Sequence, residues 1–205
     1  MNIRSIEDTH DTVYNGAGSD SRVFLYSGRI IKVYRPLQCV IGIDRAFSIV
    51  KQYEKDTREV SKKFSKKSEY FIDLNKCRYR IIPAIIPQGD TQISIDEIVY
   101  NSDQKYIDGQ SIAQMLRSGS GRNYANSQST SQNLFSEEVF WIHRSILPRI
   151  SSEVSNSIGR KFSVVPTNVK PLINHKKKIV YLQITDLADS LTDRYFEYCR
   201  NISSN

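Results

Sequence analysis

The spacing of apolar and polar positions predicts two strands and a long helix near the N-terminus. Residues 22–26 and 29–35 are strand-like, and Ser27-Gly28 between them suits a tight hairpin turn. Apolar residues then recur at helical spacing over 44–66. A hairpin followed by a long helix is the first indication of an α+β fold.

Strand-like and helical patterns continue along the rest of the chain, which supports the α+β assignment. One segment, 118–133, has almost no apolar residues and predicts a mobile loop. The remaining predicted elements are strands and turns over 69–100 with the clearest runs at 79–82 and 92–100, a helix after Ser111, a long helix over 134–158 kinked at Pro148, and strands over 170–173 and 179–184.

Composition narrows the class of protein. The chain has 205 residues, of which 39% are hydrophobic and 25% charged, as is ordinary for a globular protein. It has no apolar run near 18 residues and no apolar segment of signal-peptide type at its N-terminus. Its three cysteines lack zinc-site spacing and suit a reducing compartment. We therefore expect no membrane span and a cytoplasmic location.

The net charge of +7 is concentrated in two runs, 51–67 and 176–178. Such runs can contact nucleic acid, anionic lipid or an acidic partner, but solvated helix and turn surface is the simpler interpretation. No RNA-binding aromatic motif or zinc-finger pattern accompanies the charge. Nucleic acid is therefore not the expected partner, although a basic α+β protein contacting it through 51–67 stays an alternative.

The first candidate site is a glycine-rich turn followed by a lysine inside a strand. Gly16 and Gly18 let a backbone approach phosphate oxygens closely, and Val23 has the right character to cover a flat ring. Lys32 lies among apolar residues of the second strand, where a charge needs a partner or a ligand. The alternative is an ordinary hairpin with a solvated lysine.

This order of features resembles the protein kinase-like superfamily, which holds the phosphates of ATP with a glycine-rich loop and a strand lysine. The resemblance implies that Gly16, Gly18, Val23 and Lys32 contact ATP. It also implies a carboxylate on the long helix that pairs with Lys32. Glu54 is the first choice for this carboxylate and Glu59 is the second, the alternative being that both are surface acids.

A second segment strengthens the resemblance. Tyr106-Ile107-Asp108-Gly109-Gln110-Ser111-Ile112 is similar to the segment after the hinge in aminoglycoside-phosphotransferase-like and other bacterial kinase-like proteins. In that family the adenine sits against the backbone just before this turn. Ser111 is the expected N-cap of the helix that follows.

A third segment resembles the catalytic loop and the metal-binding hairpin. In 162–169, Pro166 matches the loop proline and Asn168 the metal-binding asparagine, while Ser163 stands at the position of the catalytic aspartate. Asp186, after the hairpin, matches the aspartate that binds Mg²⁺. Asn168 and Asp186 are thus the implied metal ligands. His143-Arg144-Ser145 lies in the wrong context for a catalytic loop, and we interpret His143 as a structural helix residue.

The departures from the family pattern leave two functional hypotheses. Ser21 and Ala188 replace family glycines, Ser163 cannot accept a proton as a carboxylate does, and the 19 residues after Asp186 leave no room for a large peptide-binding subdomain. In the first hypothesis the chain is a minimal atypical kinase, which transfers phosphate to an unidentified protein or small molecule. In the second it is a pseudokinase that serves as a binding or scaffolding module.

The resemblance also implies a domain organisation. We expect a two-lobed protein kinase-like fold that binds ATP and Mg²⁺ between its lobes. The N-lobe, 1–105, has an antiparallel sheet and one long helix, and the C-lobe, 106–205, is truncated and mostly helical. The nearest comparisons are bacterial: the PhoP-regulatory-network kinase-like proteins and the small effector kinases of pathogens. The second comparison adds a host cytosol as an alternative location.

Overall fold

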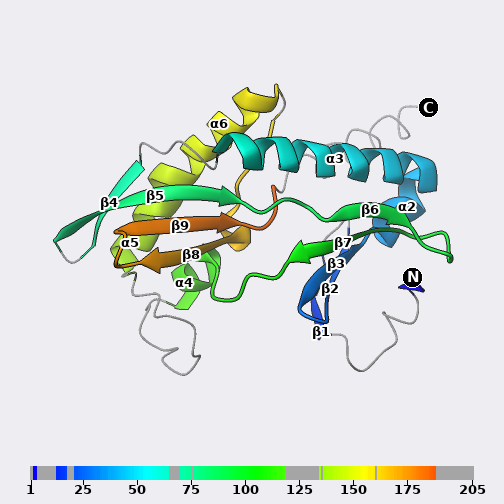
Figure 1. Cartoon of the computed structure of the whole chain (residues 1–205), viewed down its shortest axis with the longest axis horizontal. Coiled ribbons are helices and arrows are strands. Elements are labelled where there is room, and N and C mark those ends of the chain that lie inside the picture. The colour runs from blue at the N-terminus through cyan, green and yellow to red at the C-terminus, as the bar shows by residue number, and fades with distance from the viewer. Residues whose placement is uncertain are drawn as a thin grey trace. The chain divides into compact units, whose positions relative to one another are not determined.

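The computed structural model describes residues 2–3, 13–17, 21–64, 70–74, 76–118, 134, 136–159 and 161–187. Two separate β-sheets and several helices make up this part of the chain, so the predicted α+β class is confirmed (Figure 1). The predicted loop 118–133 lies outside the described residues except for Ser118, which ends a helix.

The chain divides into two compact units, and each unit contains segments that are distant in the sequence. Unit 1 comprises Met1–Arg58, Pro87–Tyr106 and Asp189–Asn205. Unit 2 comprises Glu59–Ile86 and Ile107–Ala188. The expected boundary at 105/106 lies next to the observed change of unit at 106/107. Residues 59–86 belong to unit 2, which the sequence did not predict.

Unit 1 is built on a five-stranded sheet in which every neighbouring pair is antiparallel. The strand order is β1-β2-β3-β7-β6, so β3 is the central strand. Two helices follow β3, and the first begins at the residue before Pro36, which suits a first helical turn. The elements are β1 (Val13–Ala17), β2 (Arg22–Tyr26), β3 (Arg29–Val33), α2 (Arg35–Ile41), α3 (Ile43–Phe64), β6 (Asp90–Ile93) and β7 (Val99–Lys105). The last turns of α3, from Glu59 onward, belong to unit 2.

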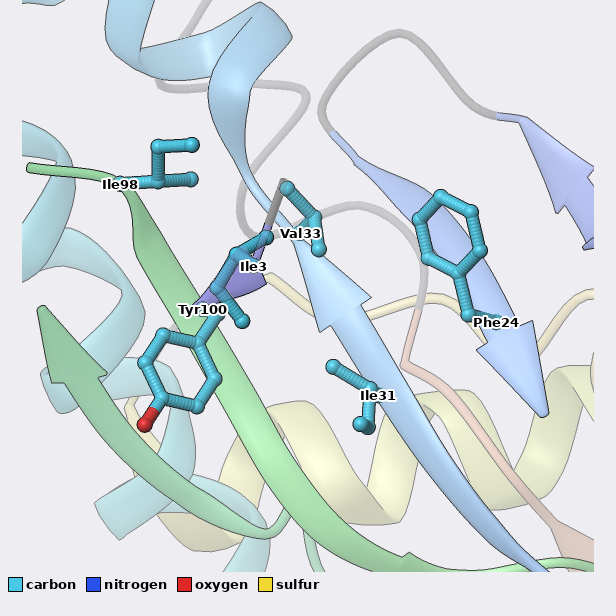
Figure 2. Close-up of a cluster of buried hydrophobic side chains, with 6 residues drawn as sticks. All are labelled: Ile3, Phe24, Ile31, Val33, Ile98 and Tyr100. Atoms are coloured by element: carbon cyan, nitrogen blue, oxygen red, sulfur yellow. The ribbon is translucent and has the colours of Figure 1, made fainter. Parts of the chain in front are cut away.

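An apolar cluster lies around the β2, β3 and β7 strands of unit 1. Phe24, Ile31, Val33 and Tyr100 are all at most 5% exposed. Ile3 and Ile98 complete this cluster (Figure 2). Phe24 is paired with Ile31 and Val33 with Tyr100, and paired residues share one face of a sheet. Lys32 lies between Ile31 and Val33 in sequence and therefore belongs to the opposite face.

Unit 2 contains a four-stranded mixed sheet. Its order is β4-β5-β9-β8, and β5 runs parallel to β9 while the other pairs are antiparallel. This sheet makes unit 2 richer in strand than the expected mostly helical C-lobe. The strands are β4 (Tyr70–Leu74), β5 (Cys77–Ile85), β8 (Val169–Asn174) and β9 (Ile179–Ile184).

Pro83 is tolerated within β5 because of where β4 stops. Within the described residues, the register with β4 ends at the Tyr70–Ile81 pair, and Pro83 is paired with Leu182 of β9 alone. At this point β5 is an edge strand, where the missing N–H of proline costs no ladder bond. Pro171 lies in β8, which is the edge strand on the other side.

The helices of unit 2 precede its second hairpin. They are α4 (Ile112–Ser118), α5 (Ser136–Trp141) and α6 (Leu147–Ile158). A π-helical segment, Ile142–Ile146, joins α5 to α6, and the N–H of Leu147 bonds the carbonyl of Ile142 five residues earlier. Pro148 follows in the first turn of α6. The irregularity predicted at Pro148 is therefore a π-helical turn just before it. No helix of the described residues is long and apolar enough to cross a bilayer.

One predicted strand is wrong. The run 92–100 was expected to be continuous, but β6 ends at Ile93 and β7 starts at Val99. Ser94 closes the turn, since its hydroxyl accepts the N–H of Ile98 and its carbonyl accepts the N–H of Glu97. Ile95 is 85% exposed in this turn, so the alternation of apolar residues that predicted a strand here does not reflect burial.

Candidate functional site

Lys32 lies at the centre of a row of paired residues that crosses the sheet of unit 1. It is paired with Val23 of β2 on one side and with Asn101 of β7 on the other. The pairing extends from Val23 to Gly16 of β1 and from Asn101 to Thr91 of β6. Because directly paired residues share a face, these five residues form one line, which we call the Lys32 row.

The Lys32 row is polar and buried over its central and β6 portions. Lys32, Asn101 and Thr91 are at most 5% exposed, whereas Val23 is half-buried. The Asn101 amide nitrogen donates to the Gly89 carbonyl at 2.6 Å and to the Thr91 hydroxyl at 3.2 Å. Its amide oxygen, Oδ1, is buried and has no hydrogen-bond partner among the described residues. A buried unpaired acceptor is uncommon in folded proteins, and here it lies beside Lys32 in the register.

Glu54 of α3 reaches the end of the Lys32 row. Its carboxylate accepts the backbone N–H of Thr91 at 2.9 Å. Lys51 contacts it at 3.0 Å and Arg58 at 3.1 Å, from positions i−3 and i+4 of the same helix. Glu54 is only 3% exposed, which no surface acid would be. The alternative, that both candidate acids are surface residues, therefore does not hold for Glu54.

The environment of Glu54 favours its ionised form. Burial alone would raise the pKa of this carboxyl, but hydrogen bonds from Thr91 and Lys51 and the charge of Arg58 outweigh it and lower the pKa below the ordinary value of 4.5. Glu59, the second candidate, is half exposed and pairs with Lys63 at 2.7 Å. Which of the two acids pairs with Lys32 stays a prediction.

The glycine-rich turn is described only in part. Gly16 lies in β1, next to a register irregularity between Tyr14 and Gly16. Val23 follows the turn as the second residue of β2, and it shares the face of Lys32. Gly18 lies outside the described residues.

The hairpin of β8 and β9 brings the two implied metal ligands to one end of unit 2. Asn168 ends a short 3₁₀ turn, Pro166–Asn168, directly before β8, and Asp186 follows β9 by two residues. The Asn168 carbonyl accepts the backbone N–H of Thr185 at 2.9 Å and its hydroxyl at 3.2 Å. These bonds hold Thr185 against Asn168, and Asp186 is the next residue after Thr185. We call Asn168, Thr185 and Asp186 the hairpin mouth.

The donor types at the hairpin mouth fit a hard divalent cation. Carboxylate and amide oxygens are ligands that Mg²⁺ accepts, and its sites in phosphate-binding proteins commonly use one or two carboxylates plus phosphate oxygens. Among the described residues no group of three or more His, Cys, Asp and Glu side chains could hold a metal. A Mg²⁺ site made of one carboxylate, one amide and phosphate oxygens does not need such a group.

Ser163 lies in the loop between α6 and the 3₁₀ turn, and two serine hydroxyls of α6 hold this loop. Ser151 Oγ accepts the N–H of Val164 at 2.9 Å, and Ser155 Oγ accepts the N–H of Phe162 at 2.9 Å. Phe162 and Val164 are buried, whereas Ser163 between them is half-buried. The loop therefore presents Ser163 on its other side.

The segment 106–112 forms a turn and a capped helix start, as predicted. The Ser111 hydroxyl accepts the N–H of Gln114 at 3.3 Å, and the Gln114 side chain accepts the N–H of Ser111 at 2.8 Å. This reciprocal pair is a capping box. Lys170 of β8 was not singled out in the sequence, yet its ammonium group donates to the Ile107 carbonyl. Burial lowers the pKa of Lys170, and the charge of Asp108 partly opposes this effect.

The structure thus groups the predicted residues in two sets. Gly16, Val23, Lys32 and Glu54 belong to unit 1, and Ser163, Asn168 and Asp186 belong to unit 2. Sequence reasoning missed Asn101 and Thr91, which join Lys32 to Glu54 through the row. The sequence carries a signal for Asn101, because residues 101–105 are all polar and contain no glycine or proline. No protein-family model and no curated protein sequence matches the chain.

Proposed function

We propose that this chain is a kinase-like nucleotide-binding protein that holds Mg²⁺-ATP. In this proposal the Lys32 row contacts the phosphates and the adenine, and the hairpin mouth supplies the metal ligands Asn168 and Asp186. The two units then correspond to the two lobes of a protein kinase-like fold.

One observation carries the proposal. A buried lysine on the third strand of an antiparallel sheet shares its cross-strand row with a residue that bonds a buried glutamate of the following long helix. In protein kinases the phosphate-binding lysine is on the third strand and its glutamate partner is on the helix after it. A solvated lysine in an ordinary hairpin would not be 5% exposed.

A second observation favours the pseudokinase form of this function. A pocket of about 530 Å³ includes Ser163, and none of its described lining residues is a carboxylate. The proton of an acceptor hydroxyl would therefore find no acidic side chain there to receive it. Phosphoryl transfer depends mainly on positioning and charge neutralisation, so slow turnover remains compatible with this arrangement.

Two measurements on the whole chain separate the forms. Calorimetric titration with ATP in the presence and absence of Mg²⁺ measures binding, and release of labelled phosphate from γ-labelled ATP measures turnover. Binding without turnover supports the pseudokinase, whereas binding with turnover supports the kinase. Absence of Mg²⁺-dependent binding contradicts both.

A further inference from the structure

The described lining residues of the pocket beside Ser163 all belong to unit 2. It lies between the helix that continues through the π-helical segment into α6 and the loop 161–166. Its volume of about 530 Å³ is in the range of small-molecule sites. We call it the loop pocket, and its lining residues are His143, Leu147, Pro148, Ser151, Ser152, Ser155, Lys161, Phe162, Ser163, Val164 and Pro166.

The walls of the loop pocket are fixed by hydrogen bonds. Ser151 Oγ donates to the Leu147 carbonyl at 2.8 Å while it accepts the N–H of Val164. Ser155 Oγ lies 2.7 Å from the Ser151 carbonyl and accepts the N–H of Phe162. These two hydroxyls serve the wall itself. The hydroxyls of Ser152 and Ser163 are not part of this tether.

The chemistry of the lining points to an anion. Lys161 contributes an ammonium group and His143 an imidazole, and both groups can donate hydrogen bonds. Ser152 and Ser163 add two hydroxyl donors. The lining contains no Asp or Glu among the described residues. Glu153, the neighbouring acid on α6, accepts a hydrogen bond from the Tyr70 hydroxyl and is not a lining residue.

The backbone at His143 is also unusual. His143 lies in the π-helical segment Ile142–Ile146, which the bond from Leu147 N–H to the Ile142 carbonyl closes. Single π-helical turns within α-helices occur frequently at functional sites. His143 is therefore a helix residue, as predicted, and it also lines this pocket.

We propose that the loop pocket binds a small phosphate-bearing compound, with the phosphate held by Lys161, His143 and the hydroxyls of Ser152 and Ser163. Charge-assisted bonds from the ammonium and imidazole groups select a phosphate over a neutral ligand of the same size. The described lining residues of this site include none of the Lys32 row or the hairpin mouth, and they include Ser163, which stands at the position of the family's catalytic aspartate. The site adds a second ligand to the proposed function and places that ligand beside the loop that resembles a catalytic loop.

The test follows the imidazole signals of His143 by NMR while inorganic phosphate is added at constant pH. The His143→Gln variant assigns these signals among those of the three histidines. We expect a saturable shift, and at least about tenfold weaker phosphate binding in Lys161→Glu. Lys176→Glu makes the same charge change at an exposed turn outside the pocket and is expected to bind phosphate as the unmodified chain does.

Three results would contradict phosphate binding in the loop pocket. They are an absent shift, a shift that Lys161→Glu leaves unchanged, and a shift that Lys32→Met abolishes, since the last would place phosphate at the nucleotide site. Failure of the proposed function is seen separately, as absence of Mg²⁺-ATP binding in calorimetry. The pocket stands if the His143 shift depends on Lys161 while ATP does not bind.

Discussion

Glu54 of α3 accepts a hydrogen bond of 2.9 Å from the backbone N–H of Thr91 in β6. This bond ties the long helix to the edge strand of the sheet, at the end of the row that contains Lys32. Strand pairing links the buried Lys32 to Asn101 and Asn101 to Thr91, and the Thr91 N–H links this row to the buried carboxylate of Glu54 on α3.

Replacement of Glu54 by Gln should lower the free energy of unfolding by about 2 kcal/mol, because a buried, charge-assisted set of hydrogen bonds is lost. Urea unfolding measures this change. Glu59→Gln is the matched control, since Glu59 is half exposed and pairs across one helical turn with Lys63. It should cost less than about 1 kcal/mol. Equal costs for the two variants would contradict the structural role given to Glu54.

The contribution of Glu54 should also depend on pH. The folded chain lowers the pKa of this carboxyl, so its stabilising effect is fully present above the ordinary pKa of 4.5 and is lost as the pH falls through the folded value. The difference in unfolding free energy between the unmodified chain and Glu54→Gln should therefore shrink as the pH is lowered from 7 toward that range. A difference that grows on acidification would have the wrong sign.

Gly89 should tolerate no side chain. A Cβ at this position would lie 1.4 Å from the Ser102 carbonyl oxygen, which is part of the β7 backbone. We expect Gly89→Ala to cost more than about 3 kcal/mol, because the backbone of β6 or β7 must move and the bond from Asn101 to the Gly89 carbonyl is strained with it. Thermal unfolding provides the measurement.

Gly28→Ala is the control for Gly89→Ala. Gly28 has a positive φ of 73° in an exposed turn, but an added Cβ would meet nothing within 4 Å. It should cost about 1 kcal/mol for the left-handed backbone alone. Similar melting temperatures for the two variants would show that the close approach of Gly89, the residue before β6, to the β7 backbone at Ser102 is not as described.

The serine tether should control the loop that carries Ser163. Ser155→Ala removes the acceptor of the buried Phe162 N–H, which should cost about 1–3 kcal/mol for an unsatisfied group and speed hydrogen exchange at Phe162. Ser157→Ala removes a hydroxyl whose bond among the described residues is to the Val154 carbonyl of its own helix. Its effect on the exchange at Phe162 should be negligible, and comparable exchange rates in both variants would argue against the tether.

The local elements of this fold were accessible from the sequence because their signals are local. The hairpin around Ser27-Gly28, the long helix ending at Phe64 and the cap at Ser111 follow from turn chemistry, helical periodicity and capping. The placement of Asn168 and Asp186 at one end of a hairpin also followed, since two adjacent strands bring together the residues that flank them.

The non-local pairings were not accessible. The parallel pairing of β5 with β9 joins segments about a hundred residues apart, and no short pattern in either strand encodes its partner. The same limit hid the role of Asn101, whose importance lies in being opposite Lys32 rather than in its neighbours in sequence. The place of His143 in a pocket lining was not accessible for a related reason, because the loop pocket exists only once 161–166 is placed against the helix.

The central claim is that Lys32 and Asp186 serve one bound nucleotide, and calorimetric titration with Mg²⁺-ATP tests it most directly. We expect the unmodified chain to bind, and Lys32→Met and Asp186→Asn each to weaken binding by at least about tenfold. Lys105→Met, at an exposed position of β7, and Asp73→Asn, at an exposed position of β4, should bind as the unmodified chain does. Absence of binding by the unmodified chain, or equal binding by all four variants, would contradict the claim.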